Sequence, residues 1–331
     1  RSPFTELRHE AGFNISVPLP DKHRISASYN YSTESDYWSH QAGLRAIISL
    51  LKDNATLQFG FDYGHNTVGK RLGPTGALLQ GVLQTSHLSA AWTHLLSRRT
   101  LLTGSYEVTF ATGYMNNPYR PVFVLGIGGP ERRETEQLPT SRIRHSLAVS
   151  AHSLLPTKST LVPHVTLRPG LRLHTDSWGL FAVSPELATY VPVGPTEFRL
   201  LLSYYNQRGA EFYRSDGDCL PTYYPDTPAY CQGAVPWGRV PDTGDATAGQ
   251  VYTSDVKLGS YSTYNWELQW KWRLSFLSRL GTLGERLSRT ALELSAVHRF
   301  LTPDGAKDTE YADLSLRIRT GLDPEAVRER G

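Results

Sequence analysis

Hydrophobic and polar residues alternate one by one along much of the chain, most clearly in segment 264–276. The apolar positions of this segment are Trp266, Leu268, Trp270, Trp272, Leu274 and Phe276. The positions between them hold Glu267, Gln269, Lys271 and Arg273. A period of two places each set on its own face of a β-strand, whereas a helix would mix the two sets. The run is also longer than the roughly five or six residues of an average strand.

The same alternation recurs in segments 24–31, 56–63, 102–110, 142–152, 161–174, 197–205 and 313–319. Short turns are predicted at 18–22, 52–54, 97–99, 156–159 and 193–195. Long polar loops are predicted at 64–81, 113–140 and 213–250. Long strands with tight turns at one end and long loops at the other are typical of an outer-membrane barrel. A soluble sandwich also alternates, but seldom over strands of this length.

The pattern therefore predicts an all-β fold, an antiparallel transmembrane β-barrel of about 12–14 strands. We favour 14, because bacterial single-chain barrels usually close with an even number. Short periplasmic turns and long extracellular loops are expected. Every backbone polar group must be paired inside a bilayer, so the sheet has to close, with its apolar face toward lipid and its polar face toward the lumen. A single domain is expected over 1–331, with a polar C-terminal tail at 322–331.

Composition narrows the class of protein further. No run approaches the ~18 uninterrupted apolar residues of a membrane helix, so a helical membrane protein is excluded. The net charge is 34 − 31 = +3 and the basic residues form no tract, so no nucleic-acid partner is expected. The chain begins at Arg1 and holds one methionine, Met115. We expect an export signal to have been removed and the protein to lie in the bacterial outer membrane.

The two cysteines, Cys219 and Cys231, lie in the long polar loop 213–250. Their spacing matches no zinc or thiol-redox motif. In an oxidising compartment, such a pair is expected to form a disulfide that staples this extracellular loop; two free thiols are the alternative. The aromatic residues of the loop suit either a binding surface for a protein partner or a lid that packs over the barrel mouth.

Several short motifs are familiar as a set: 34–37 (ESDY), 113–120 (GYMNNPYR), 141–145 (SRIRH), 176–178 (DSW) and 204–213 (YYNQRGAEFY). Together they resemble domain-of-unknown-function family 3570, a family of uncharacterised Gram-negative outer-membrane proteins. The resemblance spans most of the chain. It implies an outer-membrane β-barrel, and it implies no reaction.

Strand parity assigns many charged side chains to the lumen. The basic ones are Arg24, Arg45, Arg142, Arg144, Arg168, Arg172, Arg199, Lys271, Arg273, Arg299, Arg317 and Arg319. The acidic ones are Asp62, Glu107, Glu186, Glu197, Glu267, Glu293 and Asp313. An excess of Arg and Lys favours anions in a channel, whereas Arg–carboxylate pairs filling the interior would block it. The residues predicted to line the lumen and set its selectivity are Arg142, Arg144, Arg168, Arg172, Arg199, Glu107, Glu186, Glu197, Glu267, Lys271 and Arg273.

Catalytic and metal sites were weighed against simpler interpretations. His87 and Ser89 have the spacing of an outer-membrane phospholipase, but parity puts them on the lumen side, with no third residue to orient the histidine. The pairs Asp62–His65 and Asp36–His40 would suit an omptin-like protease, although solvated rim residues are the better interpretation. The remaining histidines are interpreted as hydrogen-bonded pore wall rather than metal ligands: His145, His152, His164 and His174. No enzymatic activity, cofactor or metal is predicted.

The sequence leaves two functions open for a non-enzymatic outer-membrane barrel. The first is a narrow or obstructed channel for small, negatively charged solutes. The second is a structural or partner-binding barrel of an outer-membrane assembly, with no transport role. The lipid bilayer is the expected partner in both cases, and the long extracellular loops would carry any contact with another protein.

Overall fold

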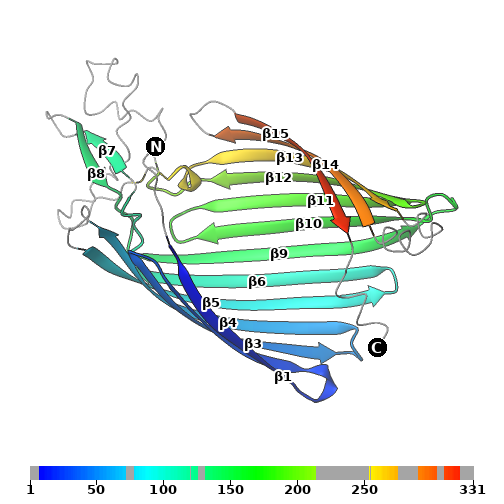
Figure 1. Ribbon diagram of the computed structural model, residues 1–331, viewed down its shortest axis with the longest axis horizontal. Coiled ribbons are helices and arrows are strands. Elements are labelled where there is room, and N and C mark those ends of the chain that lie inside the picture. Colours follow the sequence, from blue (N-terminus) through cyan, green and yellow to red (C-terminus); the bar gives the residue numbers. More distant parts are fainter. Residues whose placement is uncertain are drawn as a thin grey trace.

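The computed structural model describes residues 7–71, 78–119, 121–125, 131–213, 253, 255–274, 290–303 and 309–320. One antiparallel sheet of 13 strands dominates it, and Figure 1 shows this sheet as a curved wall. Its strands are β1 (His9–Pro18), β2 (Arg24–Thr33), β3 (Tyr37–Leu50), β4 (Ala55–Arg71), β5 (Leu78–Ser97), β6 (Thr100–Gly113), β9 (Ser141–Pro156), β10 (His164–Asp176), β11 (Phe181–Val193), β12 (Thr196–Arg208), β13 (Tyr261–Arg273), β14 (Thr290–Pro303) and β15 (Thr309–Thr320). A separate hairpin pairs β7 (Pro121–Leu125) with β8 (Glu131–Thr135).

Each strand of the large sheet pairs antiparallel with the next one along the chain, except that β6 pairs with β9 across the β7–β8 hairpin. The described residues also contain two short 3-10 turns, η1 (Pro20–Lys22) and η3 (Val256–Leu258). No helix in the described ranges is long and apolar enough to cross a membrane. The predicted all-β antiparallel architecture is confirmed.

The two edge strands, β1 and β15, run in the same direction. This follows because 13 strands separate them by an even number of antiparallel steps. Within the described part of the chain, no backbone pairing joins β1 to β15. Thirteen lies inside the expected range, and antiparallel closure requires an even number, so 14 stays a prediction for the complete barrel.

The two faces of the sheet differ as the alternation predicts. On β12 the exposed apolar side chains are Phe198, Leu200 and Leu202, and on β13 they include Trp266 and Leu268. The large exposed hydrophobic residues of the other long strands follow the same parity, for example Leu147 and Val149 on β9. An apolar band of this kind along one face of long strands is typical of a barrel surface that faces hydrocarbon. We call this the outer face, and the opposite face the inner wall.

The ends of the sheet differ as well. Tight turns follow β1, β3, β5 and β11 at one end. At that end Lys22 pairs with Asp53, and together with a hydrogen bond from Ser49 it lowers the pKa of the Asp53 carboxyl below its usual value. We call the opposite end, where the chain passes from β6 to β9 and from β12 to β13, the long-loop rim. Two tight turns, at 34–36 and 177–180, also lie there.

One predicted loop is largely strand. The segment 64–81 was expected to be a polar loop, but β4 continues to Arg71 and β5 begins at Leu78. The two strands stay paired as far as Arg71 opposite Leu78, although the sequence there no longer follows the apolar alternation. The expectation of a loop was therefore wrong for 64–71 and 78–81, and residues 72–77 lie outside the described residues. Cys219, Cys231, loop positions 214–250 and the tail 322–331 lie outside the described residues, so the disulfide stays a prediction.

Candidate functional site

Several of the charged residues that strand parity assigned to the lumen lie on the inner wall, among them Arg168, Glu186, Arg199 and Glu267. Two ion pairs stand on it: Arg168 Nη2 lies 3.3 Å from Glu186 Oε1, and Arg199 Nη1 lies 3.1 Å from Glu267 Oε1. The first joins β10 to β11 and the second joins β12 to β13. Both pairs therefore join neighbouring strands and lie along the wall, where part of each side chain stays exposed.

Other predicted lumen residues have no ion pair among the described residues: Arg144, Arg172, Glu197 and Lys271. Glu197 and Lys271 face each other across β12 and β13, so their charges partly compensate. The Arg144 Nε is buried without a hydrogen-bond partner. The Arg273 side chain lies outside the described set. The role of all these residues in selectivity stays a prediction.

Glu107 belongs to a cluster that the sequence did not reveal. His87 Nδ1 lies 3.4 Å from Asp62 Oδ2, and His87 Nε2 lies 3.7 Å from Glu107 Oε2. The three residues come from β4, β5 and β6, and strand register alone brings them together. No hydrogen bond joins His87 to Ser89 in the described part of the chain, so the nucleophile–base pair of a phospholipase is not formed.

The two acid–histidine pairs considered for proteolysis are also not formed. Asp62 and His65 are an odd number of residues apart on β4 and therefore face opposite sides of the sheet. His40 lies on the outer face, where its Nδ1 is 2.8 Å from the Tyr29 hydroxyl. Asp36 instead accepts a hydrogen bond from the Tyr119 hydroxyl.

The prediction that His145 faces the lumen was wrong, because the residue lies on the outer face. It follows the odd, outward parity of β9, and its Nδ1 lies 2.7 Å from the hydroxyl of the outward Tyr106, with the two rings stacked. His152, His164 and His174 follow the inward parity. The described residues contain no group of three or more His, Cys, Asp or Glu side chains able to hold a metal ion.

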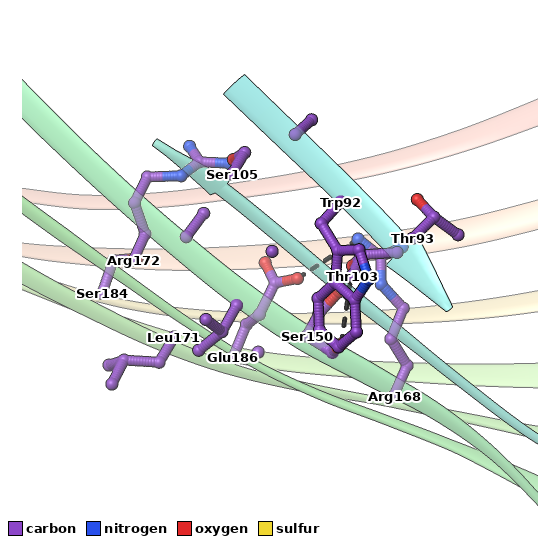
Figure 2. Close-up of a pocket in the computed structure, with 15 residues that line it drawn as sticks. Trp92, Thr93, Thr103, Ser105, Ser150, Arg168, Leu171, Arg172, Ser184 and Glu186 are labelled. Carbon is purple, nitrogen blue, oxygen red and sulfur yellow. Dashed lines mark hydrogen bonds and ion pairs between the residues drawn. The ribbon is translucent and has the colours of Figure 1, made fainter. Parts of the chain in front are cut away.

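A cavity of about 210 Å³ opens in the inner wall where β5, β6, β9, β10 and β11 lie side by side. Figure 2 shows Arg168 reaching Glu186 on one side of it, while Arg172 extends separately. Hydroxyl side chains from neighbouring strands form part of the lining, among them Thr103, Ser105, Ser150 and Ser184, and Trp92, Val149 and Leu171 are its large apolar members. The lining also includes two of the predicted lumen arginines and one predicted lumen carboxylate.

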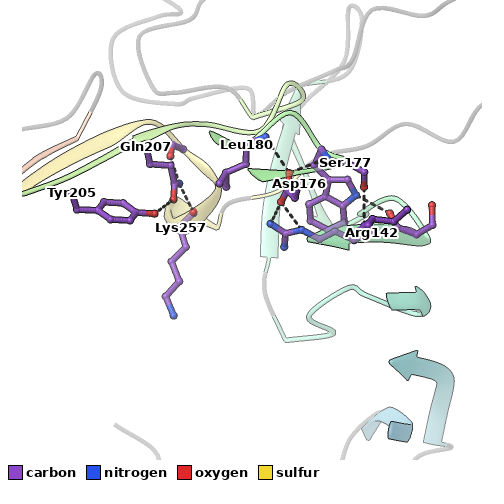
Figure 3. A network of polar contacts seen from close by, with 11 residues as sticks. Arg142, Asp176, Ser177, Leu180, Tyr205, Gln207 and Lys257 are labelled. Atoms are coloured by element: carbon purple, nitrogen blue, oxygen red, sulfur yellow. Dashed lines mark hydrogen bonds and ion pairs between the residues drawn. The ribbon is translucent and has the colours of Figure 1, made fainter. Parts of the chain in front are cut away.

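The long-loop rim holds a buried pair, shown in Figure 3. Arg142 on β9 donates from Nε to Asp176 Oδ2 at 2.8 Å, and its guanidinium carbon lies 4.1 Å from the centre of the Trp178 ring. The other Asp176 oxygen accepts from the backbone N–H groups of Trp178 and Leu180, at 2.9 and 3.1 Å. Arg142 was predicted to set lumen selectivity, but this geometry fixes it at the rim.

Around this pair the rim builds a small hydrophobic core. Its members come from the turn after β10, from the start of β11 and from both ends of the β12–β13 connection: Trp178, Leu180, Ala182, Ala210, Phe212 and Leu258. Gln207 on β12 reinforces the junction by donating to the carbonyls of Lys257 and Gly259, at 2.8 and 2.7 Å. The turn at 177–180 is therefore anchored by its buried residues Trp178 and Leu180.

Glu136 ties two long connections together. Only 1% of it is exposed, and its carboxylate accepts from the Asn117 backbone N–H at 2.9 Å and from the Thr253 hydroxyl. Burial, with the negative charge of Glu136 nearby, raises the pKa of the Tyr114 hydroxyl. Sequence reasoning missed this residue because a single glutamate in a polar loop has no periodic signal.

A model of the family described as "Protein of unknown function (DUF3570)" matches residues 1–290. No functionally curated protein matches the sequence.

The structure is similar to the siderophore receptor PirA from Pseudomonas aeruginosa, with 15% identity, a TM-score of 0.53, and coverage of 94% of this chain and 57% of that one. The ferric-catecholate import receptor Fiu from E. coli K12 has 7% sequence identity and a TM-score of 0.49, with coverage of 96% of this chain and 61% of that one. CdiB from Acinetobacter baumannii has 8% sequence identity and a TM-score of 0.47, with coverage of 96% of this chain and 51% of that one. The chain thus spans a little over half the length of these proteins. The likeness to PirA concerns the fold alone, an outer-membrane β-barrel, and confirms the predicted fold class and outer-membrane location.

Proposed function

Because the chain belongs to the DUF3570 family of proteins of unknown function and has an outer-membrane β-barrel fold, we propose that it is a narrow, non-enzymatic channel for small, negatively charged solutes. Membership of the family agrees with the motifs that suggested it. The family description assigns no activity, so the proposal stands on the residues of the inner wall.

The observation that carries the proposal is the set of inner-wall arginines without an ion pair. Within the described residues these include Arg24, Arg45, Arg144 and Arg172. Guanidinium groups that lack a carboxylate repel one another and retain water and anions between them, and rings of Arg and Lys select anions in pores. Among the wall carboxylates, Glu186 and Glu267 pair with arginines. Asp62 and Glu107 lie 3.4 and 3.7 Å from His87, which forms ion pairs with them only when its ring is protonated.

The ion pairs themselves support an open interior rather than a plug. A plug would need side chains that meet across the lumen, whereas each recorded pair of the inner wall joins neighbouring strands. The narrow part of the proposed channel is the long-loop rim. There Tyr119 reaches Asp36 and Thr253 reaches Glu136, so segments from different parts of the chain are tied together.

A liposome-swelling assay tests the proposal. Purified protein in vesicles should admit a small carboxylate faster than a neutral polyol of similar size, and Arg144→Gln combined with Arg172→Gln should reduce that preference. The matched control is Arg99→Gln, which removes the same charge from the exposed turn at 98–99 and should leave the preference unchanged. Vesicles that admit neither solute would instead favour the structural or partner-binding role.

A further inference from the structure

The cavity in the inner wall is built around Arg172. In the strand register, Arg172 on β10 faces Ser184 on β11 and Ala148 on β9, and Ala148 in turn faces Ser105 on β6. These four residues form one row across four strands with the same inward parity. Two short hydroxyl side chains and a methyl group thus surround one long cationic side chain, which leaves the cavity of about 210 Å³ unfilled.

The neighbouring row of residues explains why the Arg172 guanidinium has no ion pair with Glu186. Gly170 precedes Arg172 on the same face and pairs with Glu186 across β10 and β11. A Cβ at Gly170 would lie 2.9 Å from Glu186 Cγ, so the glutamate side chain extends over the space that the glycine leaves. There its carboxylate meets Arg168 at 3.3 Å. Glu186 is therefore engaged by Arg168, and no ion pair to Arg172 is formed among the described residues.

The cavity consequently presents donors that have no acceptor. In the part of the chain that the structure describes, no hydrogen bond is made by the hydroxyls of Ser105 and Ser184, and the buried Arg168 Nε has no partner. Two guanidiniums and one carboxylate line the cavity, which gives a net charge of +1. Donors without acceptors in a positively charged recess are the complement of an oxyanion.

We propose that this cavity binds one small oxyanion, a carboxylate or a phosphate, with Arg172 as the primary ligand. The planar guanidinium can donate two parallel hydrogen bonds to a pair of oxygens, and a spherical halide offers no such pair. A volume of about 210 Å³ lies below the roughly 300–1,000 Å³ of sites for drug-sized ligands, so the ligand has only a few heavy atoms. The inference rests on the proposed function, because it places a binding station on the path of the conducted solute.

Equilibrium titration with inorganic phosphate tests the inference without requiring transport. The folded protein in detergent micelles should broaden the ³¹P resonance of phosphate in a saturable manner, and acetate should compete for the same site. Chloride at an equal ionic strength should compete poorly. A wild-type protein that gives no saturable broadening would overturn the inference.

Three variants locate the site. Arg172→Gln should weaken phosphate binding by about tenfold or more, the usual effect of losing a charge-assisted hydrogen bond. Glu186→Gln should strengthen it several-fold, because the competing negative charge disappears and Arg168 becomes available. Arg99 lies in the exposed turn between β5 and β6 and does not line the cavity, so Arg99→Gln should bind as the wild type does. Equal binding by Arg172→Gln and wild type, or weaker binding by Glu186→Gln, would contradict the assignment.

The outcomes separate the two proposals. Saturable phosphate binding in a protein that passes no solute through vesicles would retain the oxyanion site and remove the channel. Anion-preferring permeation without saturable binding would retain the channel and remove the site. All variants should first show the strand content of the wild type by circular dichroism, and the opposite shifts expected for Arg172→Gln and Glu186→Gln cannot both arise from misfolding.

Discussion

Two arginine–carboxylate pairs that share strand β10 have opposite environments. At the long-loop rim, the Arg142 and Asp176 side chains are 16% and 0% exposed, whereas on the inner wall those of Arg168 and Glu186 are 37% and 36% exposed. The rim pair stacks on Trp178 and has every Asp176 oxygen occupied. The wall pair borders a cavity with unused donors. An arginine–carboxylate pair thus anchors a turn at the rim, where the pair is buried. On the inner wall, where the pair is exposed to solvent, it borders the proposed binding cavity.

The largest effect is expected at the rim pair. Asp176→Ala should destabilise the folded protein by about 3–5 kcal/mol, because it leaves the buried Arg142 unpaired and two backbone N–H groups unsatisfied. Asp176→Asn keeps an oxygen that can accept from the N–H groups, so it should lower the free energy of unfolding clearly less than Asp176→Ala does. Urea unfolding from phospholipid vesicles measures both. Equal losses for the two variants would show that the charge of Asp176 supplies the anchor, and that its hydrogen bonds to the two N–H groups contribute little.

The next largest effect on stability is expected on the outer face of the sheet, and it tests which face contacts lipid. Leu268 lies on the outer face in the middle of β13, so Leu268→Arg should cost about 2–4 kcal/mol if this position is near the bilayer midplane. Gln269→Arg, on the inner wall one residue further along, should be mild. Folding yield into vesicles compares the two, and equal tolerance would reverse or remove the assignment of the faces.

The loop attached to the rim gives a third, more local effect. If Cys219 and Cys231 are bridged, the closed segment is short and its stabilisation should be at most about 3 kcal/mol, confined to the loop. Thiol labelling of denatured, unreduced protein should find no reactive cysteine. Two labelled thiols per chain would establish the alternative of a loop without a staple.

The smallest effect on stability is expected at the wall pair. Glu186→Gln should change the free energy of unfolding by no more than about 1 kcal/mol, because both partners are more than a third exposed and the pair is screened by solvent. Its visible consequence should be in anion binding instead. A loss as large as that of Asp176→Ala would mean that the two pairs do not differ in the way their burial indicates.

The sequence predicted the wall far better than the rim. Alternation of the kind seen around Trp266 and Leu268 repeats on every long strand, because lipid and lumen impose the same period on each one. Parity also placed Arg168, Arg172 and Glu186 on one face. The pairing of each arginine with a particular carboxylate depends on the register between strands, and this register cannot be read from a single sequence.

The rim escaped prediction for a different reason. Trp178, Phe212 and Leu258 meet only after the chain has folded back between connections that are far apart in sequence. Contacts of this kind have no period, and a buried Glu136 looks the same in sequence as a solvated one. Asp62 shows the limit within the wall: its true partner, His87, lies on the next strand, whereas the nearby His65 points to the opposite face.

The most direct test of the central claim is the reversal potential of the purified protein in a planar bilayer under a salt gradient. The unpaired arginines of the inner wall predict a small conductance whose reversal potential has the sign of anion selectivity. Arg172→Gln should move that potential toward zero. A large, cation-selective conductance would contradict the account, because it would mean that the charges assigned to the inner wall do not line the path of the ions.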